Sequence, residues 1–266
     1  MSVTLTILGS GSSAGVPRPA LGWGACDPNN PKNRRRRCSL LIEKIGGAGV
    51  TRVLIDTSPD LREQLIDANV DRLEAVFLTH EHADQTHGID DLRSVVLHMR
   101  KRIPVYLNQS TAKDIASRFA YCFEQASGSD YPAILSRHSI EAGDTQTIEG
   151  RGGSVALTAF LLQHGNIPAL GYRIGNVAYT PDLNDIPKES FNALENLDLW
   201  IIDALRYAPH PSHFSLDDAL SWIGRFKPRR AVLTNLHSDL DYEVLRVKLP
   251  DGIVPAYDGM QLTIDS

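Results

Sequence analysis

Three side chains of the kinds that bind metal ions stand at alternate positions near residue 80. His80, His82 and Asp84 directly follow the apolar run Leu73–Leu78, which predicts a short buried strand. A backbone that is extended or turning at a strand end can point all three side chains in the same direction. Imidazole nitrogen and carboxylate oxygen suit zinc, iron or manganese. The pattern favours a metal site over the alternative, a solvated polar loop.

The elements that must position this cluster follow from hydrophobic patterning. Strands are expected at 1–8, 38–44, 52–56, 73–78, 104–107, 155–163, 169–174, 177–180, 199–203 and 231–234. Helices are expected from Ser58 and at 90–100, 110–125, 188–194, 215–226 and 242–249. Strand-rich runs begin each half, and strands then alternate with helices, so we expect two packed sheets with helices outside. No linker divides the halves, which predicts a single domain over residues 1–266.

The composition excludes several classes of protein. Hydrophobic residues make up 42% and charged residues 22% of the 266 residues, which is ordinary for a globular protein. The formal net charge of -5 argues against a surface devoted to nucleic acid. No apolar run approaches the roughly 20 residues of a membrane-spanning helix. Three cysteines give no disulfide framework, and the start lacks a signal-peptide pattern, so a cytoplasmic protein is expected.

Four segments together resemble a known enzyme family. Leu78–Asp84 with Gly88 resembles the signature loop of the metallo-β-lactamase superfamily, Thr-His-x-His-x-Asp-His followed by a glycine. The turn Gly9–Ser13, the stretch Asn33–Arg37 and the stretch Ile55–Asp60 resemble the phosphodiesterases that act as accessory proteins of carbon–phosphorus lyase. The similarity covers nearly the whole chain. It implies an αββα sandwich of two mixed β-sheets flanked by helices, with metals at one edge.

The resemblance also implies the remaining ligands of two divalent metal ions. It makes His164 the third histidine of the first metal, beside His80 and His82. Asp182 would bridge both metals, and His237 would be the last ligand of the second. Zinc is the expected metal and manganese the alternative. Each of the three later residues alone could be an ordinary strand-end or turn residue, but their order along the chain favours ligation.

Two departures from the family pattern affect these expectations. Gln85 stands where the signature has a histidine, and an amide oxygen is a poorer zinc ligand than imidazole, so the second site should be weakened or rebuilt. His87 is a candidate replacement ligand, unless it faces solvent. The resembled proteins often hold a structural zinc with several cysteines in the first loop. That loop keeps only Cys26 here, and a closed site needs four ligands, so this zinc is not expected.

The site implies a hydrolytic reaction. Two metals about 3.5–4 Å apart can activate a water molecule and clamp the oxygens of a phosphate during in-line attack. Asp84 and Asp182 would anchor the ions and orient the nucleophile. His213, before a predicted helix, resembles the active-site histidine of the phosphodiesterase branch and would act as general acid or as a donor to phosphate. His210 is the competing candidate for that role.

Further residues are candidates for supporting roles. Ser10 and Ser12 lie in the glycine-rich turn, where a substrate phosphate could approach the backbone. Asp56 would either accept the outer N–H of a ligating histidine or cap the helix that begins at Ser58. The run Arg34–Arg37 could attract an anionic substrate, although a solvated charged stretch is the commoner explanation.

The leading hypothesis is a metal-dependent phosphodiesterase that acts on a small cyclic phosphate or a nucleotide-like diester. The alternatives are a lactone or thioester hydrolase on the same scaffold, an RNA-processing nuclease, and a metal-holding binding protein with reduced catalysis. The acidic net charge and the lack of a protruding RNA-binding arm disfavour the nuclease. The sequence leaves the oligomeric state open, and a homodimer is one arrangement that it allows.

Overall fold

The structure is a computed structural model that describes residues 2–125 and 127–265; residues 1, 126 and 266 lie outside that part. Two seven-stranded sheets are formed, with strand orders β14-β1-β2-β3-β4-β5-β6 and β13-β12-β11-β10-β9-β8-β7. The strands are β1 (Ser2–Gly9), β2 (Ser39–Gly46), β3 (Gly49–Ile55), β4 (Ala75–Phe77), β5 (Ile103–Leu107), β6 (Leu135–Ser139), β7 (Thr145–Ile148), β8 (Val155–His164), β9 (Ile167–Ile174), β10 (Val177–Thr180), β11 (Leu199–Asp203), β12 (Arg230–Thr234), β13 (Ile253–Pro255) and β14 (Met260–Asp265).

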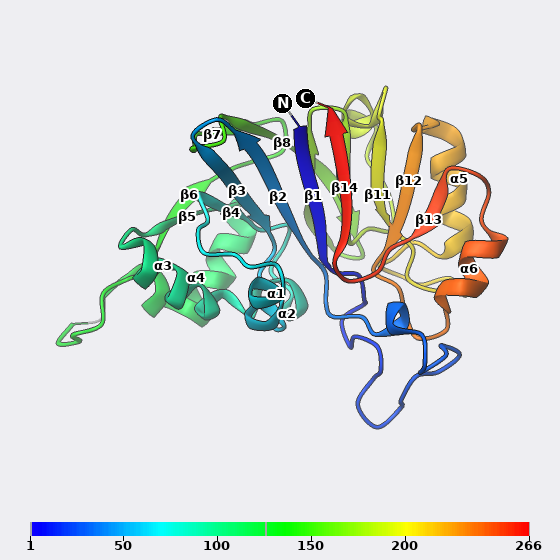
Figure 1. The fold of residues 1–266 in the computed structure, drawn as a ribbon, viewed down its shortest axis with the longest axis horizontal. Helices are drawn as coiled ribbons and strands as arrows, with labels where there is room; N and C mark the ends of the chain where they lie inside the picture. Colours follow the sequence, from blue (N-terminus) through cyan, green and yellow to red (C-terminus); the bar gives the residue numbers. More distant parts are fainter. Residues whose placement is uncertain (1, 126, 266) are drawn as a thin grey trace.

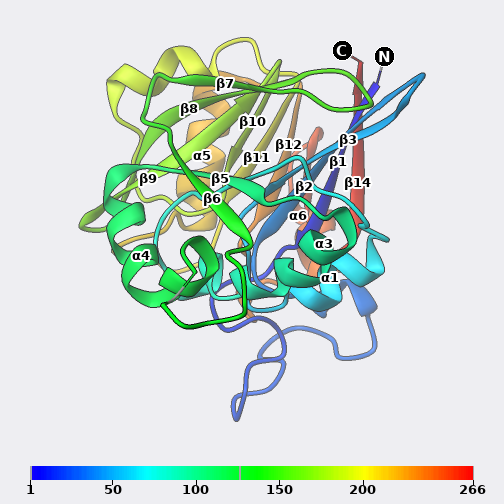
Figure 2. The same ribbon diagram turned by 90° about the vertical axis from the view of Figure 1, so that its left-hand side faces the viewer.

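Helices cover the outer faces of the two sheets (Figures 1 and 2). They are α1 (Leu61–Asp67), α2 (Ala83–Thr86), α3 (Leu92–Met99), α4 (Gln109–Phe123), α5 (Leu216–Phe226) and α6 (Tyr242–Lys248), with 3-10 turns η1 (Pro31–Asn33), η2 (Ile89–Asp91) and η3 (Lys188–Leu194). One buried apolar cluster joins the facing sides of both sheets. Two others join the second sheet to α5 and the first sheet to α3 and α4. The αββα sandwich of two mixed sheets is therefore confirmed.

The parallel strands of the second sheet bring their carboxyl ends to one edge. β11 runs parallel to both β10 and β12. All five residues of β11 are buried, as expected of a parallel strand covered on both faces. In this register Thr180 ends β10 opposite Ile202, and Asp203 ends β11 opposite Thr234 of β12, so the loops after these strands begin at the same edge.

Four strands were absent from the prediction. β6, β7, β13 and β14 are short or present polar, exposed side chains along much of their length, so they lack a strong apolar run. The segment predicted as a helix at 188–194 forms the 3-10 turn η3 instead. The helix α1 begins after Asp60, so Ser58 is not its N-cap residue.

Three of the four arginines in the run Arg34–Arg37 have hydrogen-bond or ion-pair partners within the protein. Arg35 is 2% exposed and donates to two backbone carbonyl groups. Arg36 pairs with Asp258 at 3.1 Å, and Arg37 pairs with Asp60 at 2.9 Å. These contacts fasten the long first loop beneath the sheets (Figure 1). The expectation of a solvated or substrate-attracting stretch is corrected for these three side chains, because their charges already have partners.

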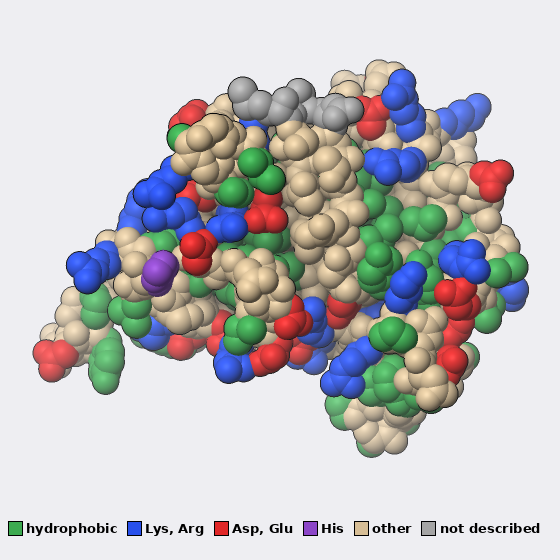
Figure 3. All heavy atoms as spheres, viewed as in Figure 1, with side chains coloured by type: hydrophobic (Ala, Val, Ile, Leu, Met, Phe, Trp, Pro, Cys, Tyr) green, Lys and Arg blue, Asp and Glu red, His purple; other side chains and the backbone are tan. Residues whose placement is uncertain are grey.

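The surface carries both charge signs. On the face drawn in Figure 3, acidic and basic side chains are interspersed. Among the described residues, each helix is too short or too polar to cross a membrane.

Candidate metal centre

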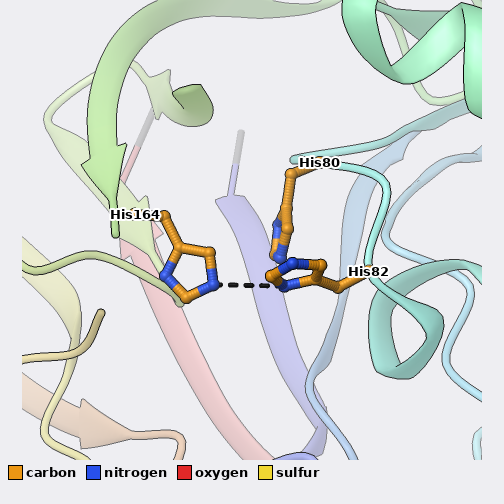
Figure 4. Close-up of side chains that lie close together, drawn as sticks. All are labelled: His80, His82 and His164. Atoms are coloured by element: carbon orange, nitrogen blue, oxygen red, sulfur yellow. Dashed lines mark hydrogen bonds between the residues drawn. The ribbon is translucent and has the colours of Figure 1, made fainter. Parts of the chain in front are cut away.

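Three histidines from the two sheets meet at one edge of the sandwich. His80 and His82 follow β4, whereas His164 is the last residue of β8 (Figure 4). Their ring centroids lie 4.6, 4.9 and 5.0 Å apart, and one ring nitrogen of each lies within 4.8 Å of the others. The structure therefore brings together the three histidines that were predicted to hold the first metal.

A hydrogen-bond chain fixes the tautomer of His80. The Asp56 carboxylate accepts from the Thr79 backbone N–H at 2.8 Å and from its hydroxyl at 3.0 Å. Because that hydroxyl donates to Asp56, its oxygen accepts from His80 Nδ1–H at 3.0 Å. His80 Nε2 then keeps its lone pair and, among the described residues, has no hydrogen-bond partner although it is buried. Asp56 thus acts on His80 through Thr79 and not by direct contact.

His164 is oriented by a backbone carbonyl group. Its Nδ1 donates to the Ser212 carbonyl oxygen at 2.6 Å, so its Nε2 is the acceptor nitrogen. That Nε2 lies 3.2 Å from His82 Nδ1, the contact drawn in Figure 4. Burial is the main cause that lowers the pKa of His80 well below its usual range and the pKa of His164 to about 3. Both imidazoles are therefore neutral, which is the form that binds metals.

His213 lies beside this cluster and carries a carboxylate partner. One ligand atom each of His164, Asp182 and His213 lies within 4.8 Å of the others. His213 Nδ1 lies 2.9 Å from Asp203 Oδ2 and 3.6 Å from Asp182 Oδ1. Burial, the largest single cause, would lower the pKa of His213, but the Asp203 carboxylate, with Asp182 and Asp84, outweighs it and raises the pKa to about 9. The competing His210 contacts the His213 ring at 5.1 Å between centroids.

Two side-chain amides hold the Asp182 carboxylate. Gln85 Nε2 donates to Oδ2 at 2.8 Å, and Asn235 Nδ2 donates to Oδ1 at 3.0 Å. Asp182 is almost fully buried, and burial raises its pKa well above the usual range. Each oxygen of Asp182 thus accepts one hydrogen bond from an amide.

Two of the predicted ligands have other partners. His237 Nε2 accepts from the Arg18 guanidinium at 2.7 Å, and its Nδ1 donates to Asp239 at 2.8 Å. Because arginine can only donate, the Nε2 lone pair of His237 is already engaged. The His87 ring packs on Phe119 with 5.4 Å between centroids. The structure thus places neither histidine in the cluster.

The remaining candidates lie around the site. Asp84 is half-buried in the first turn of α2, and its charge adds to the causes that raise the pKa of Asp182. Ser10 donates through its backbone N–H and its hydroxyl to Asp258, at 2.9 and 2.8 Å. Ser12 is buried, and its N–H donates to a backbone carbonyl oxygen. The glycine-rich turn is thus tied to the protein, with the Ser10 side chain directed to Asp258.

Sequence reasoning missed Asp203, Asn235 and Thr79 as members of the site. Asp203 is the last residue of one strongly apolar strand and Asn235 directly follows another, so a polar residue at the end of a buried parallel strand was the available signal. Thr79 was visible only as part of the metal-binding signature.

The sandwich with three histidines and a buried aspartate at its edge has the architecture of a metallo-β-lactamase-fold hydrolase. The chain belongs to the family described as "Beta-lactamase superfamily domain", which matches residues 51–235. The structure is similar to that of "a New Diphosphatase from the PhnP Family", with TM-score 0.87 and 34% identity over 99% of this chain and 98% of that one.

Two other proteins extend the comparison. The fold is shared with PqqB from Methylobacterium extorquens, at TM-score 0.76 and 17% identity over 97% of this chain and 99% of that one. The sequence is 36% identical over 262 residues to a protein of Porphyromonas gingivalis (strain ATCC BAA-308 / W83) named "Octanoyltransferase". The match covers 97% of this chain but 51% of that protein, so the chain spans about half the length of this relative.

Proposed function

We propose that the protein is a metal-dependent phosphodiesterase that cleaves a small cyclic phosphate, a nucleotide-like diester or a related diphosphate. The observation that carries the proposal is the pair His213–Asp203 beside the three-histidine cluster. It supplies a proton donor next to the position where a metal would hold a phosphate. The similarity to a diphosphatase over nearly the whole of both chains supports the same substrate class.

The residues of the cluster fit a divalent cation. The partnerless Nε2 of buried His80 and Nε2 of His164 offer two imidazole lone pairs, and Asp182 adds a carboxylate. His82 Nδ1 would offer a third lone pair once a cation replaces its 3.2 Å hydrogen bond with His164. This donor set suits zinc, with manganese as the alternative. When bound, such a cation supplies Lewis acidity that lowers the pKa of water and polarises a phosphate oxygen.

The protein's own residues then manage the proton and the geometry. The Asp203 carboxylate holds His213 by Nδ1 and keeps the imidazole protonated near neutral pH, because its pKa is raised to about 9. Protonated His213 donates to the departing oxygen, so an alcohol leaves in place of an alkoxide. Asp84 and Asp182 offer carboxylates that orient the attacking water.

An acyl hydrolase is the second candidate function. It is favoured by the relative named "Octanoyltransferase". That relative is about twice as long as this chain, so its named activity can reside in the part that this chain does not match. The same metal scaffold also serves acyl chemistry, and fold alone does not choose between the two.

A substrate panel tests the proposal. The purified protein, loaded with zinc or with manganese, is assayed on nitrophenyl phosphodiesters, cyclic nucleotides, dinucleoside diphosphates, nitrophenyl octanoate and octanoyl thioesters. We expect turnover of the phosphorus compounds that disappears on chelation. Turnover of the acyl compounds alone would replace the proposal with the second candidate.

We further propose a cytoplasmic location. The thiols of Cys26, Cys38 and Cys122 are free and buried, which is compatible with a reducing compartment. The homodimer stays a prediction, which light scattering in solution tests.

A further inference from the structure

We infer that Gln85 and Asn235 stand in for a second cation, so that the site holds one divalent ion. The inference rests on the proposed metal site but is independent of the substrate. A carboxylate that bridges two metals must offer a lone pair to each of them. Here each oxygen of Asp182 already accepts one amide N–H, at 2.8 and 3.0 Å, which leaves fewer of its four lone-pair sites for cations.

The orientation of the Asn235 amide follows from its neighbours. Its Nδ2 lies 3.0 Å from the Pro181 carbonyl oxygen as well as 3.0 Å from Asp182 Oδ1. A carbonyl oxygen can only accept, so the nitrogen must face Pro181, and the same nitrogen then also faces Asp182 Oδ1. An amide nitrogen has no lone pair to give a metal. Asn235 therefore presents a donor on the side where a second ion would need a ligand.

The Gln85 amide is constrained in a similar way. Its side chain is fully buried, and its backbone N–H and C=O are bonded to His82 and Thr57. Turning the amide over would place Oε1 against Asp182 Oδ2, which would bring two acceptors together at hydrogen-bond distance. Oε1 is buried and has no partner among the described residues, but an amide oxygen is a poorer zinc ligand than imidazole.

The donors that remain are too few for a second zinc. His237 is engaged on both ring nitrogens, by Arg18 and Asp239. His87 packs on Phe119. His213, which has a ligand atom within 4.8 Å of those of His164 and Asp182, is held through Nδ1 by Asp203. Asp84 and a shared Asp182 would be left as strong ligands, whereas catalytic zinc sites take about three protein ligands. The amides act instead as positioning residues: their N–H dipoles stabilise the buried Asp182 carboxylate and direct it toward the three-histidine cluster.

Metal stoichiometry tests the inference directly. The protein is stripped with a chelator and dialysed against Zn²⁺ or Mn²⁺ alone, and bound metal is measured by mass spectrometry. We expect one equivalent per chain with either metal, and with Mn²⁺ the paramagnetic resonance spectrum of an isolated ion. Two equivalents, or the spectrum of a coupled pair, would overturn the inference.

Substitutions of Gln85 sharpen the test. Gln85→Glu keeps the shape but places a second carboxylate about where the amide donates, so it should recruit a second equivalent and raise Tm as metal is added. Gln85→Ala removes the amide without adding a ligand and should stay at one equivalent. The double variant Gln85→His with Asn235→His should also reach two.

The outcomes are separable from those of the substrate panel. A folded Gln85→Glu protein, verified by circular dichroism, that stays at one equivalent at saturating metal would contradict the role given to the amide. Inactivity on every phosphodiester would sink the proposed function, but it would leave the measured stoichiometry and this inference intact.

Discussion

The two sides of the candidate centre differ in what their side chains present. On the imidazole side, His80, His82 and His164 gather ring nitrogens, and the buried Nε2 of His80 has no partner among the described residues. On the amide side, Gln85 and Asn235 direct N–H groups at the oxygens of Asp182. One side offers lone pairs to a cation, whereas the other places one donor on each oxygen of a carboxylate. If the site holds one ion, hydrogen bonding has limited how many ions this sheet edge accepts.

The largest effect is expected from removing a ligand on the imidazole side. His82→Ala should abolish bound metal and activity with little cost to folding, because the His82 side chain is exposed. Metal content, turnover and circular dichroism measure these three properties. His80→Ala should lose metal as well, although His80 is buried and its loss also leaves a cavity.

His87→Ala is the matched control for His82→Ala. Both residues lie in the same loop region and both are exposed, but His87 contacts Phe119 and lies outside the cluster. The His87→Ala variant should keep its metal and its activity. Loss of metal in His87→Ala would make His87 a ligand, and wild-type metal content in His82→Ala would show that His82 is not one.

His213 should show an effect that depends on the leaving group. His213→Ala should lose on the order of 10²–10⁴-fold with an alkyl or ribose leaving group, the range for one general acid. Nitrophenyl diesters should be almost unaffected, because nitrophenolate leaves without protonation. Steady-state kinetics on both substrate types measure the difference.

His210→Ala serves as the control for His213→Ala. The His210 ring lies beside His213, but its Nδ1 contacts Ser212 and not a carboxylate. We expect little change with either leaving group. An equal loss of both substrates in His213→Ala would make His213 a phosphate-binding or structural residue.

Thr79 links Asp56 to the imidazole side. Thr79→Val removes the hydroxyl that joins the two residues and should weaken metal binding about 10–100-fold, as is typical of groups that orient a ligand. Competition titration with a chelating dye measures the affinity. Thr79→Ser should restore most of the affinity, since the hydroxyl returns. If the Thr79→Val variant bound metal as tightly as wild type, the Asp56–Thr79–His80 hydrogen bonds would not contribute to metal binding.

The smallest effect is expected in the pH profile of Asp203→Asn. A general acid works while protonated, so activity on alkyl diesters should fall as pH rises through the pKa of His213, about 9. The Asp203 carboxylate raises that pKa, and its loss should move the alkaline limb to lower pH. Profiles of kcat/KM against pH show the shift. If the alkaline limb of the profile did not move, its pKa would belong to a group other than His213.

The sequence predicted the fold and placed part of the candidate centre at the strand ends where the structure has it. Alternating apolar strands and the strand-end cluster indicated the two sheets and the positions of His80 and His82, because both depend on local spacing. The resemblance supplied His164 and Asp182. The substitution at Gln85 was visible as a departure, but its contact with Asp182 spans 97 residues and could not be read from the chain.

The directions in which the side chains of the candidate site point could not be predicted from the sequence. His237 was expected to be a ligand, but it contacts Arg18, which lies 219 residues earlier in the chain. His87 follows the short helix α2, where the turn directs its ring to Phe119. Asp203 reaches His213 only because β11 and the loop before α5 lie at one edge. Each outcome depends on tertiary contacts that local patterns do not specify.

The joining of β1 to β14 has a consequence for biosynthesis. β1 pairs with β14, and the Ser10 hydroxyl donates to Asp258 across 248 positions. Translation makes β1 before β14, so this pairing cannot form until β14 has left the ribosome. Contacts of such high sequence separation slow folding and leave strand edges open meanwhile. The nascent chain should therefore depend on chaperones until Asp258 emerges.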